Sequence, residues 1–100
     1  MRLYHPADAA ALRSLRAGMS VTLPALAAAS DDEEDEFAAL AAASEAGTVV
    51  VVAEVDDPED GDDQTITLDK VVAVHVDADG SGDLAWYATQ EIDEVLRLLS

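Results

Sequence analysis

The amino-acid sequence predicts an α+β fold: a single two-layer domain over residues 1–100, with a mostly antiparallel sheet of about four strands and about three helices. Two observations lead to this prediction. Runs of β-branched residues, typical of buried strands, alternate with segments whose apolar residues recur every three or four positions, as in amphipathic helices. Their order is strand, helix, helix, strand, strand, strand, helix, which favours an antiparallel sheet with the helices gathered on one side or end.

The length and composition limit what this domain can be. A chain of 100 residues allows one compact domain with a thin core, because 20 of its hydrophobic residues are alanines. The absence of cysteine excludes disulfides and thiolate chemistry. No apolar run approaches the length of a membrane span, and residues 1–20 lack the pattern of a secretory signal. We therefore expect a protein without membrane contact.

The first strand and the first helix are predicted close to the N-terminus. Residues 1–5 have the pattern of a short strand, and Pro6 is a signal for the start of a helix. A helix over about 7–17 follows, with Gly18 just after its end. Its buried stripe would consist of Leu12, Leu15 and Met19.

A second helix has the clearest start signal in the chain, after an ambiguous segment at 20–29. Ser30 and Glu33 fit a capping box, with Ser30 as the N-cap and Glu33 at the third helical position. Gly47 would end this helix. Its predicted buried stripe consists of Phe37, Leu40 and Ala41.

The second half of the chain contains most of the predicted sheet and the last helix. The run at 48–55 is rich in valine and suits a central strand covered on both faces. Three further strands are predicted: a short edge strand at 65–68, and strands at 71–76 and 84–88. An amphipathic helix is predicted at about 89–99.

Negative charge is the dominant feature of the composition. The chain has 22 acids against 5 bases, a formal net charge of −17. The excess belongs to residues 31–100, because residues 1–30 hold three arginines against one aspartate. Two blocks stand out: a run of six acids at 31–36 and seven acids within 54–63. Such a surface argues against direct nucleic-acid binding and favours a basic protein partner, with a merely solubilising surface as the alternative.

The candidate interaction residues combine the second acidic block with two aromatic residues. Helix capping accounts for part of the first acidic run but not for the second block. Trp86 and Tyr87 fall on opposite faces of the predicted strand at 84–88, so one faces the helices and the other faces outward. Trp86 is either the largest core residue or an interface anchor. The candidates are Asp56, Asp57, Glu59, Asp60, Asp62, Asp63, Trp86 and Tyr87.

One segment has the pattern of a metal site. Residues 77–84 match the start of an EF-hand calcium loop, which places oxygen ligands at alternate positions before a glycine. Ala88 stands where that loop needs a bidentate glutamate, and the flanking segments are predicted strands rather than helices. A hairpin loop is the alternative. Calcium is thus a possible cofactor, with candidate ligands Asp77, Asp79, Ser81 and Asp83.

Evidence for catalysis is weak in this sequence. It contains no phosphate-binding glycine loop, nucleophile elbow or zinc-protease motif. His5 and His75 lie on predicted strands and would approach each other if those strands paired, which could create a metal site or an acid–base pair. Structural, hydrogen-bonded histidines are the alternative. An enzyme is neither supported nor excluded.

Several segments, taken in order, resemble a known family. The segments are 1–7, 35–40, 49–55, 71–77 and 84–92. This set resembles a family of small, acidic, alanine-rich proteins of unknown function from actinobacteria, although the segment between the first two helices is shorter here. The resemblance implies a cytoplasmic bacterial protein and brings no activity or site residues.

Three functional hypotheses follow from the sequence. The preferred one is a non-enzymatic protein-interaction or regulatory module that binds a basic partner. The alternatives are a calcium-binding module using the 77–83 loop and a small enzyme using His5 or His75. The sequence does not predict the oligomeric state.

Overall fold

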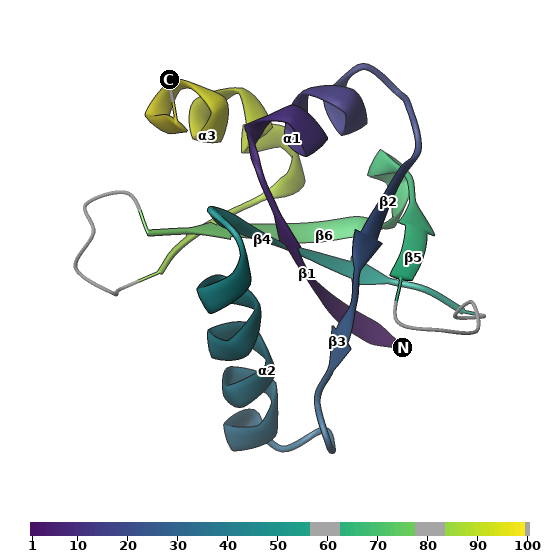
Figure 1. Cartoon of the computed structure of the whole chain (residues 1–100), viewed down its shortest axis with the longest axis vertical. Coiled ribbons are helices and arrows are strands. Elements are labelled where there is room, and N and C mark those ends of the chain that lie inside the picture. The colour runs from purple at the N-terminus through teal and green to yellow at the C-terminus, as the bar shows by residue number, and fades with distance from the viewer. Residues whose placement is uncertain (57–62, 78–83, 100) are drawn as a thin grey trace.

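The computed structural model describes residues 1–56, 63–77 and 84–99 and confirms the α+β fold class (Figure 1). Within these residues a five-stranded sheet has the order β3-β1-β4-β6-β7, and β2 and β5 form a separate pair. All described strand pairs are antiparallel. The elements are β1 (Arg2–Ala7), α1 (Ala9–Arg16), β2 (Val21–Pro24), β3 (Leu26–Ala27), α2 (Glu33–Ala46), β4 (Val49–Glu54), β5 (Asp63–Ile66), η1 (Leu68–Lys70), β6 (Val71–Val76), β7 (Ala85–Tyr87), η2 (Thr89–Glu91) and α3 (Ile92–Leu99).

Strand β4 is the centre of the larger sheet, as its valine run predicts. It pairs with β1 on one side and β6 on the other. Because side chains alternate along a strand, Val49 and Val51 belong to the core on one face, whereas Val50 and Val52 belong to the core on the other. Both faces of the sheet are therefore covered in this region.

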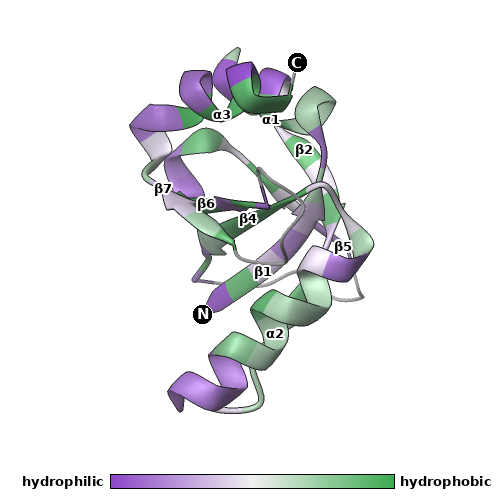
Figure 2. Cartoon of the chain, turned by 90° about the vertical axis from the view of Figure 1, so that its left-hand side faces the viewer, coloured by the Kyte–Doolittle hydropathy of each residue, from purple (hydrophilic) through white to green (hydrophobic). Residues whose placement is uncertain are grey.

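The three helices lie on both faces of the sheet, which refines the expected two-layer arrangement. Helices α1 and α3 cover one face, where Leu12, Leu15, Ile92 and Val95 are buried, and α2 covers part of the other (Figure 2). The extra layer arises because β4 presents branched apolar side chains on both faces, and each face requires a cover.

Helix α1 begins two residues later than the sequence predicts. Pro6 is part of β1, opposite Val50, and Asp8 caps the helix by accepting a hydrogen bond from the Ala11 amide at 2.9 Å. Pro6 is tolerated in the strand because β3 pairs only with the earlier residues of β1, so one side of Pro6 needs no backbone donor. Gly18, with φ of 85°, follows the helix end as expected.

Helix α2 shows the largest differences from prediction. It begins at Glu33 after Asp32, and the Ser30 hydroxyl accepts from the Asp32 amide instead of capping the helix. The predicted capping box is therefore wrong. The buried residues are Ala39 and Ala43, whereas Phe37 is 69% exposed.

Sheet geometry explains why alanines form the buried face of α2. The opposing sheet surface consists of Tyr4, Val50 and Val52, which project bulky side chains toward the helix. Small residues on the helix let the two backbones approach and fill the volume. The predicted stripe of Phe37, Leu40 and Ala41 is therefore rotated away from the sheet, and Leu40 and Ala41 are only partly buried.

The ambiguous segment at 20–29 forms two short strands that belong to different sheets. β2 pairs with β5, which corresponds to the predicted edge strand at 65–68, and β3 pairs with β1. The chain thus passes from one sheet to the other at Ala25. The C-terminal helix is present as η2 followed by α3.

Candidate interaction surface on the α2 face

A groove runs between α2 and the β6–β7 end of the sheet; we call it the aromatic groove. Two adjoining cavities of about 350 Å³ and 400 Å³ form it, and they share His75 and Trp86. The first cavity is lined by Phe37, Leu40, Ala41, Ser44, His75, Leu84 and Trp86. The second is lined by Arg2, Tyr4, Val52, Val72, Ala73, His75 and Trp86.

The groove exists because α2 covers only part of its face of the sheet. The helix packs chiefly against β1, β3 and β4. β7 is an edge strand of the sheet. Large apolar side chains on the helix and beside it are consequently left open to solvent: Phe37 is 69% exposed, Trp86 60% and Val72 41%. Exposed apolar residues that are grouped in this way are typical of interaction sites.

The structure distinguishes the two roles that the sequence leaves open for Trp86. Trp86 points into the aromatic groove, so it is not the central core residue of the domain. Tyr87 takes the opposite face and packs, partly buried, against the core under α1 and α3. Of the two aromatic candidates, Trp86 is the one available to a partner.

His75 forms part of the groove floor. It lies directly opposite Trp86 in the β6–β7 pairing, and its side chain is partly buried. Burial lowers the pKa of His75 below its ordinary value of 6.5. The ring is therefore mostly neutral at pH 7 and adds no positive charge to the groove.

Acidic residues stand at both ends of the helical wall of the groove. Glu33 and Glu34 precede Phe37 by one turn, and Glu45 follows Ala41 by one turn. All three glutamates are exposed, and within the described residues none of them forms an ion pair. Figure 2 shows the hydrophilic start of α2 projecting beyond the sheet. The groove is thus an apolar surface inside a negative field.

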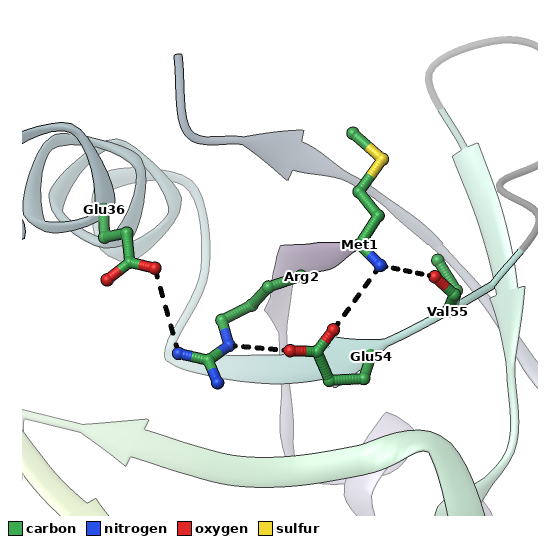
Figure 3. A network of polar contacts seen from close by, with 5 residues as sticks. All are labelled: Met1, Arg2, Glu36, Glu54 and Val55. Carbon is green, nitrogen blue, oxygen red and sulfur yellow. Dashed lines mark hydrogen bonds and ion pairs between the residues drawn. The ribbon is translucent and has the colours of Figure 1, made fainter. Parts of the chain in front are cut away.

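Arg2 is the cation beside the second cavity. Its Nε donates a hydrogen bond to Glu54 Oε1 at 3.2 Å, and its Nη1 lies 3.9 Å from Glu36 Oε1 (Figure 3). The Met1 nitrogen lies 3.5 Å from Glu54 Oε2 and donates to the Val55 carbonyl at 2.7 Å. This network joins α2 to the β1–β4 edge of the groove.

Replacing Arg2 with glutamine is expected to lower the free energy of unfolding by less than about 1 kcal/mol, because its ion pairs are largely exposed. Urea unfolding monitored by circular dichroism measures this change. Arg13→Gln is the matched control, since Arg13 is exposed and forms no ion pair among the described residues. A loss of several kcal/mol for Arg2→Gln would contradict the assignment of a surface network.

The two histidines do not share a site, which corrects the idea of a common pocket. Their strands are both neighbours of β4 rather than of each other. His5 lies opposite Val51 and His75 opposite Val50, so their side chains project from opposite faces of the sheet. His5 is fully buried, and its Nδ1 lies 3.0 Å from the Pro24 carbonyl oxygen.

The candidates from the second acidic block are only partly covered by the structure. Asp56 and Asp63 are exposed, and Asp63 is the first residue of β5. Four candidates lie outside the described residues: Asp57, Glu59, Asp60 and Asp62. Their role in binding stays a prediction.

The predicted calcium ligands are likewise mostly outside the described residues. Asp77 directly follows β6 and is partly buried, whereas Asp79, Ser81 and Asp83 are not described. Among the described residues, no group of three or more histidines and acids could hold a metal ion. Calcium binding by this loop stays a prediction.

Sequence reasoning missed the contribution of Phe37 and Val72 to an open surface. From the sequence, Phe37 is expected in the buried stripe of the predicted helix and Val72 within the predicted strand at 71–76. The available signal was the composition of α2: with alanine as its most frequent residue, the helix can bury small side chains and leave its phenylalanine outside.

Comparisons with protein-family models, with curated proteins and with solved structures found no match. The resemblance to small acidic proteins of actinobacteria therefore stays a prediction. In the part of the chain that the structure describes, no helix is long and apolar enough to cross a membrane.

Proposed function

We propose that this protein is a non-enzymatic interaction or regulatory module that binds a basic surface of another protein. The observation that carries the proposal is the aromatic groove, an exposed apolar surface with Glu33, Glu34 and Glu45 at the ends of its helical wall, none of which forms an ion pair within the described residues. The proposed setting is the bacterial cytoplasm, in line with the family resemblance.

Charge supports a basic partner over other classes. With a formal net charge of −17, the protein attracts positively charged surfaces over roughly a Debye length and repels nucleic acid and anionic membranes. Complementary charge speeds the encounter and selects the partner, whereas apolar contacts hold the complex. Acidic residues and an exposed apolar surface lie next to each other on the α2 face.

Capture experiments at two salt concentrations test the proposal. The immobilised protein is incubated with a bacterial lysate at about 50 mM and about 500 mM salt, which changes the screening length severalfold. Captured proteins, identified by mass spectrometry, are expected to be basic and to be lost at the higher salt concentration. No captured protein, or capture that is indifferent to salt, would contradict the proposal.

A charge variant supplies the control for this experiment. The double variant Glu33→Gln, Glu34→Gln removes two exposed acids that lie outside the core, so the fold is expected to remain intact. Its capture of the same proteins is expected to be weaker at about 50 mM salt. Equal capture by variant and wild type would place the binding elsewhere on the molecule.

A further inference from the structure

We infer that the aromatic groove accepts one large apolar side chain from a basic segment of the partner, whose lysines or arginines meet the glutamates at the two ends of the groove. This inference rests on the proposed function and adds the site and the chemistry of recognition. The segment inserts its apolar residue between Phe37 and Trp86, over His75.

The size and lining of the first cavity suit a single anchoring side chain. At about 350 Å³ it lies at the lower end of the range for small-molecule sites, and its lining is mainly apolar. Phe37 comes from α2 and Trp86 from β7, so an inserted residue would contact two separate elements. Interfaces commonly derive most of their binding energy from a few buried anchors of this kind.

The positions of the acids specify the charges around that anchor. Glu33 and Glu34 lie one helical turn before Phe37, and Glu45 lies one turn after Ala41, so the helical wall has carboxylates at both ends. A segment with basic residues on both sides of its anchor would match this pattern. Neutral His75 at the floor offers no competing positive charge.

Charge also disfavours a second copy of this chain as the occupant. Another copy would bring its own net charge of −17 to a surface that is already negative. Like-charge surfaces repel, and this repulsion opposes association. The occupant is therefore a basic segment of a different protein.

Trp86 makes the site directly observable. It is the only tryptophan in the chain and is 60% exposed, so its fluorescence emission is expected to shift to shorter wavelength when an apolar residue covers it. The probe is a short synthetic peptide with lysines on both sides of one central leucine. The matched peptide has alanine in place of that leucine.

The leucine peptide is expected to bind at least about tenfold more tightly than the alanine peptide and to shift the Trp86 emission. Phe37→Ala is expected to weaken binding of the leucine peptide by about tenfold, because it removes one wall of the cavity. Met19→Ala is the control: Met19 is also exposed and apolar but does not line the groove, so binding should not change.

The outcomes separate this inference from the proposed function. One outcome is that both peptides bind equally and in a salt-sensitive way, with no effect of Phe37→Ala. That result overturns the inference that the groove binds an apolar side chain, while the proposal of a basic partner stands. If neither peptide binds while basic proteins are captured from the lysate, the groove is again overturned. If the peptides do not bind and no basic protein is captured, both proposals fail.

Discussion

Replacing Gly47 with alanine is expected to destabilise the protein by roughly 2–3 kcal/mol, the effect of overpacking a site that cannot relax. A Cβ atom at this position would lie 2.6 Å from the Ala7 amide nitrogen, 2.9 Å from the Ala7 carbonyl oxygen and 3.0 Å from the Pro6 carbonyl carbon. All three are backbone atoms of β1, which is held in register by β4. Either the helix end or the strand must therefore move.

The expected loss comes from the clash and not from backbone strain. Gly47 has φ of −145° and ψ of 162°, an extended conformation that any residue adopts. Gly18 is the matched control, because it has φ of 85° and nothing within 4 Å of an added Cβ. Gly18→Ala should cost about 1 kcal/mol from strain alone.

Urea unfolding of the two alanine variants measures these losses, with the midpoint and the slope fitted separately. The larger loss is expected for Gly47→Ala. If Gly47→Ala were no less stable than Gly18→Ala, the close approach of α2 and β1 would be wrong. Since Gly47 joins α2 to β4, this approach also sets the position of the helical wall of the aromatic groove.

The strands were the most predictable part of this fold. The valine run at 49–54 and the run at 71–76 consist largely of β-branched residues, which pack well on a pleated and buried surface. The C-terminal helix was predictable for a similar reason: Ile92 and Val95 recur at helical spacing and form its buried side. In these segments local pattern and tertiary packing agree.

The orientation of α2 could not be predicted from its own residues. Alanine is small enough to be buried or exposed at little cost, so a helix rich in alanine has no strong apolar side. The surface that the helix packs against therefore determines which side of the helix is buried. Here the valines and Tyr4 of the sheet pack against Ala39 and Ala43. That same choice exposes Phe37 and creates the candidate site.

The pairing order of the strands could not be predicted from the sequence either. Nothing local places β1 and β6 on opposite sides of β4, yet this order separates His5 from His75 and puts β7 at the edge. The opposite faces of Trp86 and Tyr87 followed from strand alternation, but which face stays open depends on how far α2 reaches. Of this candidate site, Trp86 was predicted from the sequence, whereas the glutamates on α2 at the two ends of the groove and the shape of the groove were not.

Between pH 7 and pH 5 the protein is expected to lose stability as the pH falls, and His5 is the main cause. Burial lowers the pKa of His5 below 6.5, only partly opposed by its hydrogen bond to the Pro24 carbonyl. That carbonyl can only accept, so Nδ1 carries the proton and Nε2 is a buried lone pair with no partner among the described residues. Protonation of Nε2 would bury a positively charged N–H group with no hydrogen-bond acceptor among the described residues.

The sign of the pH dependence follows from proton linkage. The unfolded chain binds a proton at His5 near pH 6.5, while the folded chain does so only at lower pH. The contribution of neutral His5 is therefore complete above the unfolded pKa and is lost as the pH falls toward the folded pKa. The limiting slope for one proton is about 1.4 kcal/mol per pH unit.

His5→Asn isolates this effect, because the amide can still donate to the Pro24 carbonyl but does not titrate. Urea unfolding at several pH values above about 5, where most carboxylates stay ionised, is expected to give a smaller slope for the variant than for the wild type. His75→Asn removes the other histidine with a lowered pKa and is the matched control for a partly exposed ring. If the free energy of unfolding of His5→Asn depends on pH as steeply as that of the wild type, protonation of His5 does not limit stability. If the slope decreases more in His5→Asn than in His75→Asn, the buried histidine is the group that causes the pH dependence. Its neutral form then holds β1 to the junction of the two sheets.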